Sequence, residues 1–167
     1  YVTPIGEDTL FTCAACGYAA NREVATFRKS AAVDQPPLPV EKVSTPNTTT
    51  IDSLAALLDV TADRTAKAVF MVATVSEDQH DVEKFVFAVV RGDMDLNEIK
   101  LINAARAKAL RAAREEEIRA IGAVPGYASP IGVAASALIV VDDAIVNSPN
   151  LVAGANEAGF HLLNTNY

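Results

Sequence analysis

The sequence has 167 residues, half of them hydrophobic, and carries a formal net charge of −7 at pH 7. That length suits one domain with a sizeable core, and the apolar fraction excludes a disordered chain. No apolar run reaches the roughly 18 residues that cross a bilayer, and no signal peptide opens the chain, so we expect a soluble, cytoplasmic protein with no membrane partner. A pI of about 4.8 disfavours an autonomous, tight nucleic-acid binder, because such affinity comes mainly from cations that neutralise phosphates.

The first 40 residues are expected to be a flanking segment rather than part of the main domain. The chain opens without a Met in strand-like sequence, which suggests a piece of a larger protein. Two short strands are predicted, around residues 9–12 and 23–27. Residues 30–50 are polar and contain four prolines, which disfavour a regular element. We therefore interpret this stretch as a linker into a main domain at residues 41–167.

Cys13 and Cys16 form a single CxxC motif in the flanking segment. A structural zinc site needs four ligands, and the two histidines of the chain, His80 and His161, lie far away in sequence. Three interpretations stay open: half of a zinc site completed elsewhere, a redox pair, and an inert remnant. We favour the inert remnant, because no βαβ pattern surrounds the motif to support a thioredoxin-like pair.

The main domain is predicted to begin with a helix and a β-hairpin. Ile51, Leu54, Ala55 and Leu58 fall on one helical face, with Thr49 or Thr50 as the N-cap. Residues 66–75 and 84–91 are apolar and rich in β-branched side chains. The charged stretch between them predicts a hairpin with a longer loop over residues 76–83.

The second half of the chain predicts further helices and then three strands. Residues 95–98 resemble a capping box that opens a helix, and residues 106–121 have helical propensity with a break near Ala113. Residues 122–132 are rich in Gly and Pro and predict a loop, and three strand-like runs follow at residues 137–141, 151–153 and 160–164. This order favours an α+β fold with a mixed, mainly antiparallel sheet flanked by helices. The helix that begins near residues 95–98 is expected to have an inward face formed by Leu96, Ile99, Ile102 and Ala105.

Lys67 is the first residue whose position suggests chemistry. It sits at the start of a buried strand, and by alternation it shares a face with Val69, Met71 and Ala73. An unpaired charge on an apolar face is costly, so the ammonium must either reach water or bind an anion. Both interpretations stay open on the pattern alone.

The segment from Gly126 to Pro130 offers backbone N–H groups where glycine permits close approach of a ligand. A GxxxP spacing alone is a weak signal. Ser129 and Ser44 are disfavoured as nucleophiles, because no GxSxG elbow surrounds either of them.

Three other features have an ordinary structural interpretation beside a functional one. His161 lies in an apolar strand, where a histidine is more often a core or rim residue than a catalyst. Asp142 stands at the carboxyl end of a strand, a place that suits both ligands and turns. From Lys100 to Arg114 the chain has five positive residues and no acid. Such a run is usually a solvated helical face, and the alternative is a local RNA contact through Lys100, Arg106 and Lys108.

Five segments occur in an order that resembles the insertion domain of bacterial prolyl-tRNA synthetase, a member of the YbaK-like superfamily of aminoacyl-tRNA deacylases. The preceding residues 6–25 resemble the synthetase segment that leads into this insertion, so the likeness covers essentially the whole chain. Thr49, Ala158 and Tyr167 depart from the family pattern. The five segments are TPNTTTI (45–51), RTAKAVF (64–70), VRGDMDLNEIK (90–100), GAVPGYASPIG (122–132) and GANEAGFHLLNTNY (154–167).

The resemblance implies roles for six residues. Lys67 matches a lysine that binds the terminal phosphate of the tRNA, and Gly126 and Pro130 match the GxxxP loop that holds the aminoacyl group. His161 matches the histidine that helps set the substrate pocket. Asp142 and Thr45 match further residues of the substrate site.

The resemblance also implies the reaction and the partners. It implies hydrolysis of alanine from mischarged proline tRNA, with the tRNA acceptor end and the remainder of the synthetase as partners. No metal or cofactor is expected for editing, and ATP would serve only the ligase core, which this chain lacks. Two alternatives stay open: a free-standing deacylase that acts in trans, and a module that binds the tRNA acceptor end without catalysis.

Overall fold

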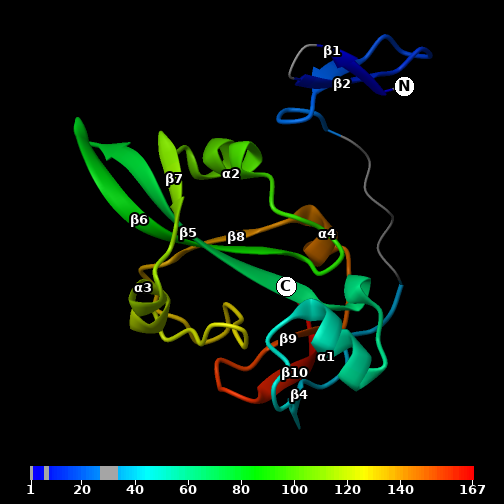
Figure 1. Ribbon diagram of the computed structural model, residues 1–167, viewed down its shortest axis with the longest axis vertical. Coiled ribbons are helices and arrows are strands. Elements are labelled where there is room, and N and C mark those ends of the chain that lie inside the picture. Colours follow the sequence, from blue (N-terminus) through cyan, green and yellow to red (C-terminus); the bar gives the residue numbers. More distant parts are fainter. Residues whose placement is uncertain (1, 6–7, 27–33) are drawn as a thin grey trace.

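The computed structural model describes residues 2–5, 8–26 and 34–167 (Figure 1). At the N-terminus, β1 (Val2–Ile5), β2 (Asp8–Thr12) and β3 (Ala19–Asn21) form a small antiparallel sheet in that order. The strand expected at residues 23–27 is wrong over its described part, because residues 22–24 form a turn. The Asn21 side chain accepts a hydrogen bond from the Val24 backbone and holds that turn. Phe27 lies outside the described residues.

A second sheet joins the start of the main domain to its end. Its strand order is β4-β10-β9, with β4 (Glu41–Ser44), β10 (Phe160–Thr165) and β9 (Leu151–Gly154), and both pairings are antiparallel. The expectation that residues 30–50 contain no regular element is therefore wrong. The four prolines flank residues 41–44 and leave their backbone N–H groups free to pair.

The main sheet has four strands in the order β7-β5-β6-β8. The long strands β5 (Ala66–Glu77) and β6 (His80–Arg91) form the predicted antiparallel hairpin. The hairpin loop is shorter than expected, because the strands continue to Glu77 and His80 and only two residues turn the chain. Asp78 and Gln79 take φ values of 48° and 67°, as a tight hairpin turn requires.

Each edge of the main sheet has one short strand. β7 (Ala109–Ala112) pairs antiparallel with β5, and β8 (Leu138–Val141) pairs parallel with β6. The sheet is therefore mixed and mainly antiparallel, and the α+β fold is confirmed.

The helix expected over residues 106–121 is present only in its second half. Residues 109–112 form β7, and α3 (Glu115–Ala120) follows after an interruption at Ala113, whose N–H donates to the Phe70 carbonyl. Arg111 lies between Glu83 on β6 and Glu117 on α3 and is hydrogen-bonded to both carboxylates. Pairing with β5 and these ion pairs outweigh the helical propensity of the segment.

The remaining helices are short. The predicted α1 (Ile51–Leu58) is confirmed with Thr50 as its N-cap, and η1 (Ala62–Arg64) and α4 (Asp143–Val146) are additional. For α2 (Glu98–Ala105) the expected capping box at residues 95–98 is wrong, because Asn97 is the N-cap and accepts from the Lys100 backbone. The predicted inward face of α2 is also shifted: Leu101 is its buried residue, whereas Ile99 is 44% exposed.

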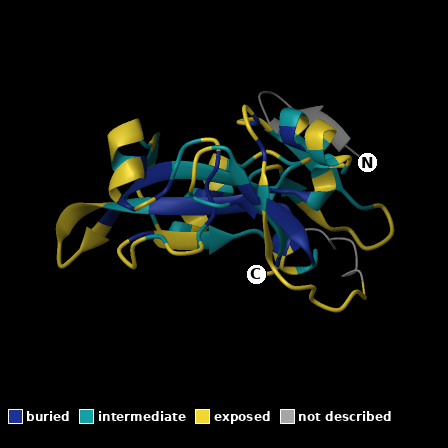
Figure 2. Cartoon of the chain, turned by 90° about the horizontal axis from the view of Figure 1, so that it is seen from below, coloured by how far each residue is buried: buried dark blue, intermediate teal, exposed yellow. Residues whose placement is uncertain are grey.

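The side chains of β5 belong to two different hydrophobic clusters, one on each face of the strand. Ala66 belongs to a cluster with Phe87, Ile145 and Leu151, and the partly buried Phe70 packs against it. Met71, Ala73 and Val75 belong to the other cluster, with Leu101 of α2. Figure 2 shows buried residues along the central strands and exposed ones at the tip of the hairpin. In the described part of the chain, no helix is long and apolar enough to cross a membrane.

Candidate functional site

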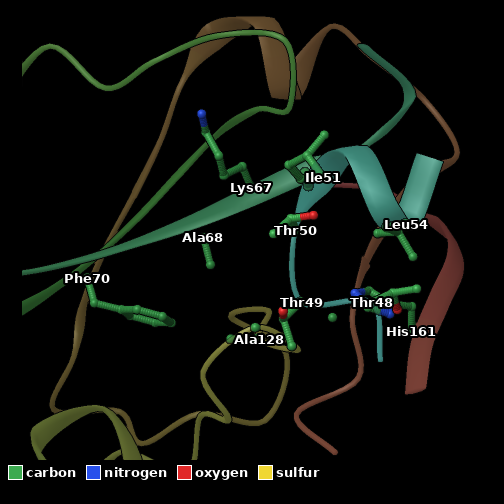
Figure 3. A pocket seen from close by; sticks show the side chains of 13 residues that line it. Thr48, Thr49, Thr50, Ile51, Leu54, Lys67, Ala68, Phe70, Ala128 and His161 are labelled. Carbon is green, nitrogen blue, oxygen red and sulfur yellow. The ribbon is translucent and has the colours of Figure 1, made fainter. Parts of the chain in front are cut away.

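A cavity of about 370 Å³ lies where α1, the start of β5, the loop over residues 122–132 and the β9–β10 pair meet. Figure 3 shows side chains from these four parts of the chain around it. The described residues that line it are apolar residues and threonines together with Lys67 and His161, and none of them is a carboxylate. The lining residues are Thr48, Thr49, Thr50, Ile51, Leu54, Ala66, Lys67, Ala68, Phe70, Gly126, Ala128, Gly154 and His161.

His161 is fixed at the inner end of the cavity by Thr45. Its Nδ1 atom lies 2.6 Å from the Thr45 hydroxyl, and both residues are buried. Burial lowers the pKa of His161 from 6.5 to about 4, so the ring is neutral at pH 7. The Tyr127 ring packs against it with 5.3 Å between the ring centroids. A neutral imidazole held in this way can shape a pocket and accept or donate one hydrogen bond.

Gly126 and Gly154 let the loop lie directly against its neighbours. Gly126 has a φ of +81°, and a Cβ atom there would come within 2.9 Å of Thr49. A Cβ atom at Gly154 would come within 2.1 Å of the Tyr127 backbone, a distance that real atoms do not adopt. Both positions therefore require glycine for packing, and both glycines line the cavity.

Two residues of the loop that line the cavity, Gly126 and Ala128, have backbone N–H groups that donate to no acceptor among the described residues. Pro130 belongs to the same loop but does not line the cavity. Such N–H groups are the type of donor that stabilises an oxyanion in acyl transfer.

Lys67 lies at the rim of the cavity, at the start of β5. Figure 3 shows its side chain on the opposite side of β5 from Ala68, with the ammonium directed away from Ala128 and Thr49. The Lys67 Nζ atom lies 3.0 Å from a carboxylate oxygen of Asp95, whose side chain is 98% exposed. The ammonium therefore reaches a carboxylate at the surface, and this ion pair is solvated and weak.

Asp142 is placed outside the cavity. Its carboxylate caps α4 by accepting a hydrogen bond of 2.8 Å from the Ala144 backbone. It therefore contributes directly to the turn between β8 and α4.

The three basic residues considered for RNA contact also lie outside the cavity lining. Lys100 donates to the Ala25 carbonyl of the flanking segment, and Lys108 forms an ion pair with Asp81. Arg106 ends α2 in the left-handed conformation and lines a separate, more open cavity. The structure thus brings together Gly126, His161 and, through its hydrogen bond, Thr45, whereas Lys67 lies at the rim with its ammonium directed away from them (Figure 3).

Cys13 and Cys16 lie in the turn between β2 and β3. A hydrogen bond from Cys16 lowers the pKa of the Cys13 thiol. Among the described residues, no group of three or more His, Cys, Asp or Glu side chains could hold a metal ion. The three interpretations of the motif remain predictions.

Asn156 and Gly154 are site residues that the sequence analysis missed. Gly154 packs under the loop, and the Asn156 side chain forms hydrogen bonds to Ser129 and Ile131 within it. The signal was the GAN stretch at residues 154–156, which was considered only as part of the motif that contains His161.

The chain is similar in sequence to known proteins. Residues 45–167 match the family model described as the aminoacyl-tRNA editing domain. The chain is 50% identical over 167 residues to a proline–tRNA ligase from Salinispora tropica and 45% identical over 166 residues to one from Dehalococcoides mccartyi. Both matches include 99% of this chain. The chain spans only 28% of the length of each relative.

The fold is also similar to a solved structure described as a putative trans-editing enzyme for prolyl tRNA synthetase. The TM-score is 0.61 over 75% of this chain and 76% of that protein, with 20% sequence identity. At that identity the likeness concerns the fold alone.

Proposed function

The chain belongs to the aminoacyl-tRNA editing domain family, and on that premise we propose that it hydrolyses alanine from mischarged proline tRNA as part of a prolyl-tRNA synthetase. The observation that carries the proposal is a small cavity that combines free backbone donors, a neutral histidine and a lysine at its rim. Likeness over 99% of the chain to two proline–tRNA ligases supports a synthetase as the parent protein. The ligase core and its ATP site would then lie in the rest of that protein.

We propose that this site selects its amino acid by volume. A synthesis site built for proline cannot strongly exclude the smaller alanine, because each lost methylene contributes only about 1–3 kcal/mol. A second site that admits alanine and excludes proline removes the error. At about 370 Å³, the cavity lies near the lower end of the usual range for ligand pockets.

We infer that water attacks the aminoacyl carbonyl with help from the loop over residues 126–130. Its N–H groups at Gly126 and Ala128 would stabilise the negative charge that develops on the carbonyl oxygen. None of the described lining residues has a carboxylate that could act as a base, and the His161 Nδ1 atom is already engaged with Thr45. A neighbouring hydroxyl of the terminal ribose would therefore orient the water. The ester is activated, so we propose that the reaction needs no metal or cofactor.

Lys67 would bind the terminal phosphate of the tRNA. Its present partner, the carboxylate of Asp95, is exposed, so the ion pair can exchange for a phosphate at little cost. Phosphate binding would require the ammonium to turn from Asp95 toward the mouth of the cavity. Lys100, Arg106 and Lys108 would contribute local tRNA contacts in the context of the whole synthetase, and Asp142 would act by shaping the nearby turn.

The direct test compares hydrolysis of alanyl-, prolyl- and cysteinyl-tRNA by the purified chain. We expect rapid loss of alanine, slower loss of cysteine and no loss of proline. Tight binding without turnover would instead identify a binding module. Equal turnover of alanyl-tRNAs with unrelated acceptor stems would favour a free-standing deacylase that acts in trans.

A matched pair of lysine variants tests the phosphate contact. Lys67→Ala is expected to lower kcat/KM for alanyl-tRNA by about 10-fold or more, because a hydrogen bond to a charged group contributes about 1.5–3 kcal/mol. Lys84→Ala is the control, since Lys84 also pairs with a surface carboxylate, that of Glu77, but does not line the cavity. Equal activity of the two variants would rule out the proposed role of Lys67. Undiminished hydrolysis of a substrate without the neighbouring ribose hydroxyl would rule out the substrate-assisted step.

A further inference from the structure

Asn156 forms four hydrogen bonds to the loop over residues 122–132. It follows β9 and adopts a left-handed conformation with a φ of 52°. Its amide oxygen accepts a hydrogen bond of 3.1 Å from the Ser129 backbone. Its amide nitrogen donates to the carbonyls of Ser129 and Ile131 at 2.9 and 2.8 Å. Its own backbone N–H donates to the Tyr127 carbonyl at 2.8 Å.

The loop that Asn156 contacts has no regular structure to support it. Residues 122–132 lie between α3 and β8 and belong to none of the sheets in the described part of the chain. Nevertheless, Tyr127, Ala128 and Ser129 are all buried. Buried backbone of this kind needs hydrogen-bond partners, and Asn156 supplies them from a segment 25–29 positions later in the chain.

Gly154 lies against the loop that Asn156 holds and also lines the cavity. The Tyr127 and Ala128 backbone lies so close to Gly154 that a Cβ atom there would come within 2.2 Å of the Ala128 nitrogen. Ala128 and Gly154 both line the cavity. Contact with β9 therefore fixes where the Ala128 backbone lies in the cavity wall, and the hydrogen bonds of Asn156 hold the loop in that contact.

We propose that Asn156 is a positioning residue that fixes the loop over residues 127–131 against Gly154 and so sets the amino-acid selectivity of the cavity. The inference rests on the proposed editing function. Asn156 does not line the cavity, and it acts through Ala128 and its N–H group. A shift of about 1 Å in such a group can cost about 100-fold in rate.

The chemistry of the contacts explains why the residue is asparagine. The side chain must donate two hydrogen bonds and accept one, which an amide can do and a carboxylate cannot. Aspartate would place negative charge beside the Ser129 and Ile131 carbonyls while keeping nearly the same volume. Asparagine also tolerates the left-handed backbone better than most residues.

The experiment compares Asn156→Asp and Asn156→Ala with the control Asn164→Ala. Asn164 is also left-handed, and its amide also donates to a distant backbone carbonyl, that of Pro39, but it lies on β10 away from the loop. For each variant kcat and KM are measured with alanyl- and cysteinyl-tRNA, and thermal unfolding is followed in parallel. We expect kcat for alanyl-tRNA to fall by about 10- to 100-fold in both Asn156 variants, with KM changed by less than about 3-fold. We also expect the ratio of alanyl to cysteinyl turnover to change, whereas the control keeps the kcat and the ratio of the unmodified chain.

The outcomes separate this inference from the proposed function. Unmodified kcat and selectivity in a folded Asn156→Asp variant would overturn the positioning role while leaving editing intact. A loss of kcat matched by Asn164→Ala at equal thermal stability would also overturn it. If the unmodified chain hydrolyses no alanyl-tRNA, the proposed function fails, and amide hydrogen exchange then tests the positioning alone. Faster exchange at Ser129 in Asn156→Ala, which removes the acceptor of the Ser129 N–H group, would support the positioning role, and unchanged exchange would overturn it.

Discussion

The β5–β6 hairpin and the loop over residues 122–132 are built in opposite ways, although both contribute walls to the same cavity (Figure 1). The hairpin pairs residue by residue from Ala66 with Arg91 to Glu77 with His80, and a two-residue turn joins its strands. The loop has no such ladder. Asn156, far along the chain, supplies its side-chain hydrogen bonds, and Gly154 leaves the space in which it packs.

This contrast predicts that the hairpin mainly determines the stability of the domain, whereas the loop mainly determines the specificity of the cavity. The hairpin supplies side chains to both hydrophobic clusters, so damage to it should unfold the domain. The loop adds only the small side chains of Ala123 and Ala128 to the first cluster, and it lines the cavity with Gly126 and Ala128. Changes there should alter turnover before they alter folding. The four predictions below test the two halves of this contrast, from the largest expected effect to the smallest.

Phe87→Ala should cause the largest loss of stability. The Phe87 side chain is fully buried, and its ring meets that of Phe70 edge-on with 4.9 Å between centroids. Truncation of a buried Phe costs about 3–5 kcal/mol, to be measured by urea denaturation. Val82→Ala near the tip of the hairpin is the control, because Val82 is 38% exposed and should cost far less. An equal loss in the two variants would contradict the central role of the hairpin core.

Stability should fall as the pH is lowered from about 6.5 to about 4, in part because of His161. Its pKa is lowered by burial from 6.5 to about 4, so the unfolded chain binds the proton first over this range. The contribution is fully present above pH 6.5 and amounts to at most about 3 kcal/mol. Unfolding free energies at several pH values, measured for the unmodified chain and for His161→Gln, isolate it. A difference between the two chains that does not vary with pH would contradict the assigned cause.

Thr50→Ala tests the helix that borders the cavity. Thr50 caps α1 by accepting a hydrogen bond of 3.2 Å from the Ser53 backbone, and it also lines the cavity. Loss of such a cap costs about 1 kcal/mol. Thermal unfolding should show this loss, and Thr50→Ser should restore most of the stability. If serine fails to do so, the methyl group of Thr50 rather than its hydroxyl is responsible.

Gln79→Gly should give the smallest effect, and in the opposite direction. Gln79 holds a φ of 67° in the hairpin turn, a conformation that costs a residue with a side chain more than it costs glycine. We expect a gain of about 0.5–1 kcal/mol in denaturant unfolding, with no change in turnover of alanyl-tRNA. A change in turnover would show that the far tip of the hairpin is coupled to the cavity.

Local sequence determined those elements whose stabilising contacts lie within or beside them. The alternation of residues 66–75 and 84–91 predicted the hairpin, and the spacing of Ile51, Leu54 and Leu58 predicted α1. The Gly and Pro content of residues 122–132 predicted a loop. In the hairpin and in α1 the pattern reports a buried face, and neighbouring residues satisfy the backbone. For residues 122–132 the composition predicted only that regular structure is absent, and the contacts that hold the loop are distant.

Tertiary structure determined the other elements and contacts, because the residues that form them are distant from one another in sequence. Residues 109–112 have helical propensity, yet they pair with β5, and residues 41–44 form a strand only because β10 lies beside them. The family resemblance pointed to Lys67, Gly126 and His161, but the turn of the Lys67 ammonium toward Asp95 depends on the loop before α2. In the same way, the Asn156 amide acquires its role only when folding brings the Ser129 and Ile131 carbonyls within hydrogen-bonding distance.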